Sequence, residues 1–370
     1  MRFLIVDTLY EGFLDWLYNQ QNPGLAGRSF QEQYAAQVAG FFHSASAWAE
    51  PLRALGHEVL DISANNAAMQ VRWMLEKGRI DSLRASADSL QFGSMHLRQQ
   101  APLGTWQRAI VAEQVRDFRP DVLLCANLYL FEDQFLESLK GFYGKAVGQH
   151  AAVMPQTSLN RFDLIISSLP NQVAAFRGRG IRAELLGLAF DARMLDRLQD
   201  RGKPHDVAFV GQVSAAHQGR ARFLAAVARE MPLAFWGGAV WPADVDPATL
   251  RLIPHPPVWG LTMYQTLRDC RMVLNYHLDE AGPYANNLRL FEVTGVGSVL
   301  VTDNKLNIRD YFEPDREVVV FDSPAECLAK IRHLQNHPAE WEQIARAGQE
   351  RTLRQHSYAN RTGELLAMLG

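Results

Sequence analysis

The sequence has few cysteines, no excess of basic charge and no long hydrophobic segment. Its 3 cysteines, Cys125, Cys270 and Cys327, are far apart in a chain of 370 residues and form no Cys-x-x-Cys pair. Neither disulfides nor a zinc site is therefore expected, and a reducing cytoplasm fits this content. A formal net charge of −3 argues against a nucleic-acid partner, whose phosphates normally select a basic face.

Several motifs of other functional classes are also missing. The sequence contains no G-x-S-x-G elbow of a hydrolase and no G-x-x-x-x-G-K-[ST] loop of an NTPase. A D-x-D sequence, a known metal-binding motif, does occur at Asp244-Val245-Asp246, but Asp246 precedes Pro247 in the manner of a helix N-cap followed by proline. We therefore expect no metal at this position.

No apolar run approaches the length of a membrane-spanning helix, and 48% hydrophobic content is sufficient for well-filled cores. The run Phe3 to Val6 is followed by Asp7, which predicts a first strand and neither a signal peptide nor a membrane anchor. We expect a cytoplasmic protein, and peripheral association with a membrane stays open.

Strand and helix patterns alternate through the first half of the chain. Short apolar runs that predict buried parallel strands lie at 3–6, 57–62, 121–126, 145–150, 163–167 and 183–187. Apolar residues recur every three or four positions from Phe30 to Leu55, which predicts one long helix that kinks at Pro51. Residues 64–104 show no clear period. The alternation indicates an open, mostly parallel, doubly wound α/β sheet over residues 1–200.

The alternation restarts after the polar segment 201–206. Further strands are expected at 206–211, 232–238, 272–277, 298–303 and 317–321, with helices between them and two more up to about Gln355. The second domain therefore covers 206–356, and a last helix follows at 357–370.

The stretch from Asn286 to Asp303 carries the most informative pattern. Asn286 and Asn287 can cap a short helix whose Leu288 and Phe291 point inward, which leaves Arg289 and Glu292 on a polar face. A helix N-terminus with an arginine beside it is suited to a phosphate, and a glutamate can accept from ribose hydroxyls. The alternative is an ordinary amphipathic helix on which Arg289 and Glu292 form an exposed ion pair.

In open α/β sheets, ligands bind beyond the carboxyl ends of the strands. In the second domain this rule selects a set of polar and glycine positions: Gly211, Gln212, Asn275, His277, Asn286 to Glu292, and Thr302 to Lys305. The helix after Gly211 adds His217, Arg220 and Arg222. For each arginine taken singly, a solvated helix residue is the alternative, and for His277 a structural histidine.

In the first domain the same rule selects Asp7, Asn127 and His150. A reaction that needs a general base would use His150 or, as a second candidate, Asp7, because either group can accept a proton near neutral pH when its pKa is adjusted. A purely structural role is the alternative for each.

The run GPYANNLRLFEVTGVGSVLVTDN at 282–304, FEPDREVVVF at 312–321 and AGQERTLRQHSYANR at 347–361 resembles the C-terminal domain of GT-B glycosyltransferases. The resemblance extends from about Asp163 to Arg361 and is strongest to the branch with spore-maturation type proteins and bacterial cell-envelope glycosyltransferases. It implies two Rossmann-like domains facing across a cleft, with a nucleoside-diphosphate sugar bound by the second domain and the acceptor by the first. It also implies that Glu292 binds the donor ribose, that Arg289 lies near the diphosphate, and that helix 357–370 packs back on the first domain.

Many retaining enzymes of this fold carry a second glutamate eight residues before the first, where this chain has Tyr284. Stereochemistry is therefore left open: inversion requires a base, whereas retention relies on stabilising the departing diphosphate. We expect a metal-independent transferase without a further cofactor, acting on a glycan, lipid-linked or protein acceptor. A sugar-nucleotide epimerase or hydrolase and a non-catalytic nucleotide-sugar or glycan-binding protein are the alternatives.

Overall fold

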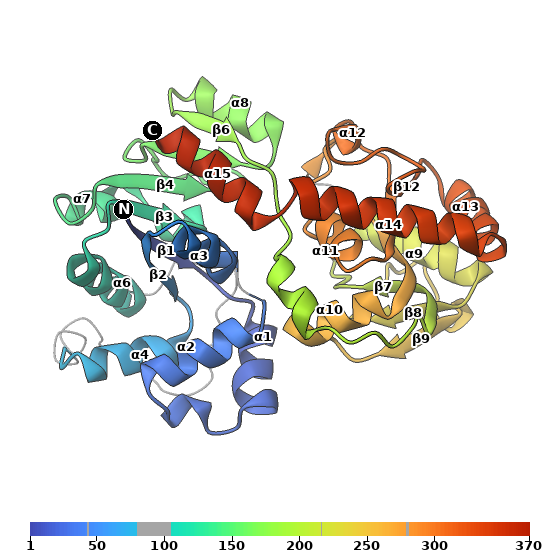
Figure 1. The fold of residues 1–370 in the computed structure, drawn as a ribbon, viewed down its shortest axis with the longest axis horizontal. Coiled ribbons are helices and arrows are strands. Elements are labelled where there is room, and N and C mark those ends of the chain that lie inside the picture. Colours follow the sequence, from blue (N-terminus) through green and yellow to red (C-terminus); the bar gives the residue numbers. More distant parts are fainter. Residues whose placement is uncertain (43, 80–104, 216, 279–280) are drawn as a thin grey trace. The chain divides into compact units, whose positions relative to one another are not determined.

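The computed structural model describes residues 1–42, 44–79, 105–215, 217–278 and 281–370. The chain forms two compact units, Met1–Leu186 with Thr362–Gly370, and Gly187–Arg361 (Figure 1). The boundary at Leu186 lies before the polar segment 201–206, which is part of the second unit.

The first unit contains a parallel six-stranded sheet with the strand order β2-β1-β3-β4-β5-β6. Its strands are β1 (Arg2–Asp7), β2 (Glu58–Ser63), β3 (Val122–Cys125), β4 (Lys145–Gln149), β5 (Leu164–Ser167) and β6 (Ala183–Leu185). All of them fall where the apolar runs predict strands. The order reverses between β1 and β3, so the ligand-binding edge of this sheet is expected where these two strands end.

The helices of the first unit depart from the sequence-based expectation in one place. The predicted single helix from Phe30 to Leu55 is wrong: α2 (Phe30–Ala39) ends before Gly40, Phe41 has a left-handed φ of 52°, and α3 (Ser44–Ala54) follows. A Cβ on Gly40 would lie 2.9 Å from the ring of the buried Phe13. Contact with a distant residue therefore requires a glycine at this point of the chain, and Pro51 lies inside α3.

The remaining helical segments of this unit cover the sheet or connect its strands. They are α1 (Glu11–Asp15), a π-helix (Trp16–Gln21), a 3₁₀ turn (Leu25–Gly27), α4 (Ala67–Glu76), α6 (Thr105–Phe118), a 3₁₀ turn (Leu128–Leu130), α7 (Asp133–Ser138) and α8 (Pro170–Gly178).

The second unit contains a parallel six-stranded sheet with the order β12-β11-β10-β7-β8-β9, which reverses between β7 and β10. Its strands are β7 (His205–Val210), β8 (Leu233–Trp236), β9 (Leu252–His255), β10 (Cys270–Asn275), β11 (Val299–Asp303) and β12 (Val319–Phe321). The edge strand β9 was not predicted from the sequence. It contains Pro254, and Ile253 is half exposed, so it lacks the apolar signature of a buried strand.

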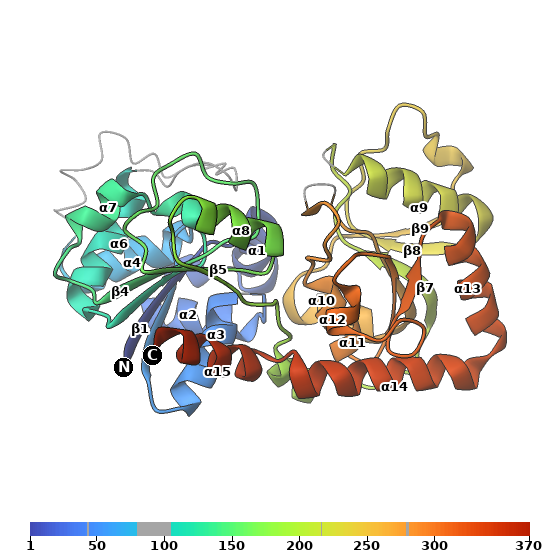
Figure 2. The ribbon, with the colours of Figure 1, turned by 90° about the horizontal axis from the view of Figure 1, so that it is seen from above.

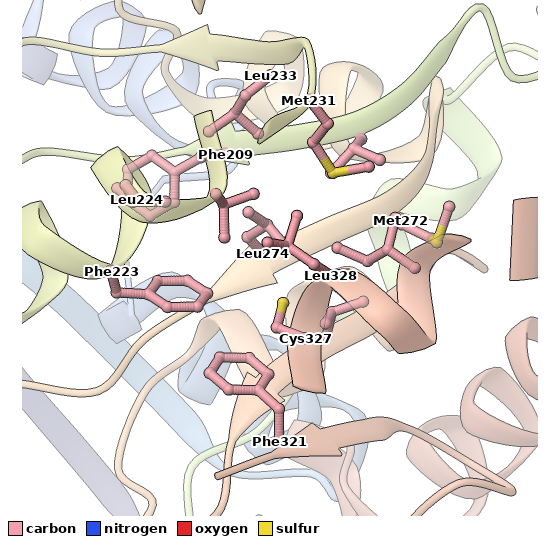
Figure 3. Close-up of a cluster of buried hydrophobic side chains, with 14 of the residues drawn as sticks. Phe209, Phe223, Leu224, Met231, Leu233, Met272, Leu274, Phe321, Cys327 and Leu328 are labelled. Atoms are coloured by element: carbon pink, nitrogen blue, oxygen red, sulfur yellow. The ribbon is translucent and has the colours of Figure 1, made fainter. Parts of the chain in front are cut away.

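Helices lie on both sides of this sheet, with α9 (Gln218–Glu230) on one side and α14 (Pro338–Gln355) on the other (Figure 2). The other helices are α10 (Gly260–Arg268), α11 (Arg289–Gly295), α12 (Ile308–Tyr311) and α13 (Pro324–Asn336), with 3₁₀ turns at Ala192–Arg197 and Pro247–Thr249. The core between α9, α13 and the sheet contains Phe223 stacked on Phe321 with ring centroids 4.7 Å apart (Figure 3). Because β10 pairs in parallel with both β7 and β11, the carboxyl ends of these three strands lie beside one another.

The last helix, α15 (Tyr358–Leu369), starts in the second unit, and its residues from Thr362 onward belong to the first. There the side chain of Lys145 donates to the carbonyl oxygen of Leu369 at 2.6 Å, and Arg182 donates to that of Met368 at 2.7 Å. The end of the chain is thus bonded to β4 and to the residue that precedes β6 in the first sheet.

Candidate donor-binding site

The loops that follow β7 and β8 lie backbone against backbone. The amide of Gly211 donates to the carbonyl oxygen of Trp236 at 2.9 Å, and that of Val213 donates to Gly238 at 3.0 Å. Gly237 has a φ of 143°, and a Cβ there would lie 1.9 Å from the carbonyl oxygen of Gly211. Only glycine fits at position 237, and the loop after Gly211 is fixed against its neighbour.

Arg220 of α9 joins the two strand ends at the point where the sheet order reverses. Its Nε and Nη2 donate to the carbonyl oxygen of Tyr276 after β10 at 3.0 and 2.9 Å, and Nη1 donates to that of Gln212 after β7 at 3.1 Å. The guanidinium therefore connects the chain after β7 to the chain after β10, the two strands between which the order reverses. The sequence had left open whether Arg220 binds a ligand or is a solvated helix residue.

His217 precedes α9 and closes the turn in front of it. Its Nδ1 accepts from the backbone amide of Ser214 at 2.8 Å and lies 3.0 Å from the Ser214 hydroxyl. The predicted ligand residue thus orders the loop that leads into α9.

The start of α11 corrects two predictions. The helix begins at Arg289 with Leu288 at the N-cap, and Leu288 is 40% exposed, so it does not point inward with Phe291. Asn287 still pairs locally, because its Oδ1 accepts from the Arg289 amide at 2.7 Å. The helix has 7 residues and starts later than predicted, since this asparagine forms a side-chain turn before it, and Asn286 is half-buried in the preceding loop.

Asn287 begins a chain of buried side-chain hydrogen bonds. Its Nδ2 donates to Asn275 Oδ1 at 2.9 Å, and Asn275 Nδ2 donates to Thr302 Oγ1 at 3.0 Å. Asn275 is 3% exposed at the end of β10, and Thr302 is fully buried near the end of β11. The chain therefore fixes the 286–288 loop against two adjacent strand ends.

Arg289 and Glu292 form the ion pair that the sequence offered as an alternative, but the pair is not on the surface. Arg289 Nη1 lies 2.9 Å from Glu292 Oε2, and the two side chains are 14% and 10% exposed. The contact lacks the direction of a hydrogen bond, so among the described residues Nη1 has no hydrogen-bond acceptor. Its N–H groups are therefore left for a further acceptor.

Tyr264 of α10 contacts the Glu292 carboxylate of this ion pair. The sequence analysis did not predict this residue as part of the site. Its hydroxyl donates to Glu292 Oε1 at 3.1 Å. Burial and the Glu292 carboxylate raise the pKa of Tyr264 well above its ordinary value. The only signal in the sequence is an aromatic residue on a helix, which is far more often part of a core.

His277 and Asp303 form a second buried pair at the ends of β10 and β11. Asp303 Oδ1 lies 2.7 Å from His277 Nδ1 and accepts from the His277 amide at 3.0 Å, and Lys305 Nζ lies 3.3 Å from Oδ2. Burial disfavours the Asp303 carboxylate, but the bonds from His277 and the charge of Lys305 outweigh it and lower the pKa of Asp303. Thr302 Oγ1 lies 3.4 Å from Asp303 Oδ1, which connects this pair to the asparagine chain.

In the first unit, the predicted residues lie at the carboxyl edge of the sheet. Asn127 Nδ2 donates to Thr8 Oγ1 at 3.0 Å across the reversal between β1 and β3, and Asp7 is half-buried with its Oδ1 accepting from the Thr8 amide at 2.7 Å. His150, after β4, is 4% exposed, and its Nε2 lies 2.9 Å from the carbonyl oxygen of Val153. Burial lowers the pKa of His150, so the imidazole is neutral near pH 7.

The D-x-D sequence has the expected capping role, since Asp246 Oδ1 accepts from the Ala248 amide at 3.0 Å before the 3₁₀ turn Pro247–Thr249. Asp244 pairs with Arg222 at 3.3 Å.

Among the helices that the structure describes, none combines the length and the apolar character needed to cross a bilayer.

Residues 218–367 match a family model described as glycosyl transferase-like. No curated protein sequence matches the chain. Several solved structures share its fold, and HepE of Anabaena in complex with UDP is one of them, with 14% identity, a TM-score of 0.59 and coverage of 100% of this chain and 99% of that one.

Sucrose-phosphate synthase from Thermosynechococcus elongatus is similar over 100% of this chain and 99% of its own, with 12% identity and a TM-score of 0.56. A glycosyltransferase from Rickettsia africae is similar over 99% of this chain and 97% of its own, with 10% identity and a TM-score of 0.57. The chain thus has the GT-B glycosyltransferase fold of two Rossmann-like domains, and its residues 218–367 match the glycosyl transferase-like family.

Proposed function

We propose that the protein is a glycosyltransferase that moves a sugar from a nucleoside-diphosphate donor, held by the second domain, to an acceptor held by the first. The observation that carries this proposal is the continuous polar chain from Thr302 through Asn275 and Asn287 to Arg289 and Glu292. It lies at the strand ends where ligands bind in such sheets, inside the segment that matches the transferase family.

In this proposal Arg289 supplies positive charge to the diphosphate, and Glu292 accepts hydrogen bonds from the ribose hydroxyls. Tyr264 and Arg289 hold the Glu292 carboxylate in place, and each carboxylate oxygen retains a lone pair for a ligand. The loop after Gly211, which His217 and Arg220 order, is the second part of the proposed donor site. UDP is the first nucleotide to test, because HepE of Anabaena binds it on a similar fold.

Asp7 and His150 are the candidate bases for a reaction that inverts the sugar configuration. A neutral His150 is in the protonation state that a base requires, although its Nε2 is engaged by Val153. Asp7 lies directly at the reversal of the first sheet. We propose that the acceptor is a cell-envelope glycan, a glycolipid or a protein, and that the transfer needs no metal ion.

The test is release of nucleoside diphosphate from UDP-, GDP- and dTDP-sugars with and without an acceptor panel. We expect acceptor-dependent release that Glu292→Ala abolishes. The matched control is Glu350→Ala, which removes an exposed carboxylate of α14 in the same domain and should leave the rate unchanged.

Other outcomes identify the alternatives. Turnover of the donor without any acceptor would indicate an epimerase or hydrolase. Binding of a nucleotide sugar without turnover, across the whole panel, would indicate a binding protein, in keeping with Tyr284 at the position of the second glutamate. Equal rates for Glu292→Ala and the unchanged protein would contradict the site assignment.

A further inference from the structure

Gln149, the last residue of β4, has a buried amide oxygen without a partner. Its Oε1 has no hydrogen-bond partner among the described residues, although the residue itself is partly exposed. Buried polar atoms in native proteins are almost always paired, and leaving one unpaired costs stability. Because ligands bind beyond the carboxyl ends of such strands, the position of this oxygen indicates that a bound group donates a hydrogen bond to it.

The register of the first sheet places Gln149 on the same face as Asp7, one of the two candidate bases. Val6 pairs with Cys125 of β3, and Cys125 pairs with Gly148 of β4, so these three residues share one face. The next residue of β1 and the next residue of β4 therefore both point to the opposite face. Two strand spacings separate them, which is about 10 Å between the backbones.

A small residue lies between these two side chains. Ala126 follows β3, and its amide donates to the carbonyl oxygen of Val6 at 2.9 Å, so it continues the ladder between β1 and β3. Its methyl group extends less far from the backbone than the side chains of Asp7 and Gln149 on either side. A ligand that contacts both flanking side chains is therefore not blocked by the residue between them.

The carboxyl edge of the first sheet offers hydroxyl, amide and carboxylate groups but no cation at the strand ends. The four residues that start at the last residue of each strand include no lysine or arginine: 7–10, 63–66, 125–128, 149–152, 167–170 and 185–188. The proposed donor site, by contrast, contains Arg289 and Lys305. An anionic group at the first edge would meet the Asp7 carboxylate without such a cation, whereas a hydroxyl can donate to a carboxylate or to an amide oxygen.

Resting on the function proposed above, we propose that the acceptor presents a neutral sugar residue to this edge. One hydroxyl of the sugar donates to Gln149 Oε1, and another is directed at the Asp7 carboxylate. Gln149 then selects the acceptor and takes no part in the donor site. Uronic acids and sugar phosphates are disfavoured at this position, because their negative charge is repelled by Asp7.

The test is saturation-transfer difference NMR of the full chain with simple sugars as probes. The neutral probes are the methyl glycosides of glucose, galactose, mannose and N-acetylglucosamine at millimolar concentration, and the anionic probes are methyl glucuronide and glucose 1-phosphate. At least one neutral glycoside should bind, and both anionic probes should bind more weakly than it does. Binding of UDP, GDP and dTDP is measured separately on the same samples.

Gln149→Met keeps the length of the side chain and removes its amide. It should weaken binding of the neutral glycoside about fivefold, which is the effect of one lost hydrogen bond, and leave nucleotide binding unchanged. The control Gln134→Met changes an exposed glutamine of α7 in the same domain and should alter neither. If Gln149→Met does not fold, the comparison of neutral with anionic probes on the unchanged protein still decides.

Three results would overturn this inference and leave the donor site intact. They are equal binding of the glycoside by Gln149→Met, preferential binding of an anionic probe, and no binding of any glycoside to a protein that binds a nucleoside diphosphate. Failure to bind any of the three nucleotides would instead contradict the proposed function itself and this inference with it.

Discussion

His356 is a buried histidine at the end of α14 whose two ring nitrogens are both used by the protein. Its Nε2 donates to the carbonyl oxygen of Tyr311 at 3.0 Å, and its Nδ1 accepts from Arg361 at 3.0 Å. The ring packs against Phe291 with centroids 5.0 Å apart. Burial lowers the pKa of His356 to about 4, because a second proton would place two positive charges in contact in an apolar setting.

This shift predicts a pH dependence of stability. Between about pH 6.5 and pH 4 the unfolded chain binds a proton at His356 that the folded protein does not, so the free energy of unfolding falls as the pH drops. The contribution is at most about 3 kcal/mol across this window. Urea unfolding at several pH values should show a shallower acid decline for His356→Gln than for the unchanged protein, and parallel curves would contradict the assignment.

At the same scale, the sequence predicts which residues gather at the strand ends better than it predicts how their side chains pack. Residue types at strand ends identified Asn275, His277, Arg289 and Glu292, which the structure brings into connected polar contacts. The orientation of Leu288 was wrong, because the buried face of a short helix is decided by its neighbours. The contact of Tyr264 with Glu292 depends on how α10 packs on α11, which no local pattern encodes.

At the scale of elements, the loops after β7 and β8 are in close backbone contact at the proposed donor site. Gly237→Ala would bring a Cβ to within 1.9 Å of the Gly211 carbonyl oxygen, at a φ of 143°. We expect a loss of about 2 kcal/mol or more in the free energy of unfolding, because the backbone of both loops must move. Nucleotide binding should weaken as well, since the Gly211 loop would be displaced.

Gly363→Ala is the control for this substitution. Gly363 lies inside α15, where a Cβ would meet no atom within 4 Å, and it has no left-handed φ. Alanine there should stabilise the protein by about 0.5–1 kcal/mol in urea unfolding. A Gly237→Ala protein as stable as the original would show that the two loops separate readily.

The helices and strands themselves were mostly predictable, and the exceptions have physical causes. Buried parallel strands are recognisable as short apolar runs, whereas β9 contains Pro254 and a half-exposed Ile253 at the sheet edge. The break between α2 and α3 follows from the approach of Phe13 to Gly40, a contact between residues far apart in the sequence.

At the scale of the whole molecule, two sheets of different strand order share one chain. The first sheet reverses between β1 and β3 and the second between β7 and β10. Each reversal is marked by side-chain bonds that cross it, from Asn127 to Thr8 in the first domain and from Arg220 to two carbonyl oxygens in the second. We expect one ligand beyond each reversal, the donor in one domain and the acceptor in the other.

The most direct test of this account is a thermal-shift screen against UDP, GDP, dTDP, CMP and their common sugar conjugates. It compares the unchanged protein with Glu292→Ala and with the control Glu350→Ala. A nucleotide at a hundredfold its dissociation constant should add roughly 2.7 kcal/mol of stability. We predict that one nucleoside diphosphate raises the Tm of the unchanged protein and of Glu350→Ala but not of Glu292→Ala. An equal rise for Glu292→Ala, or no response of the folded protein to any nucleotide, would contradict the proposed donor site.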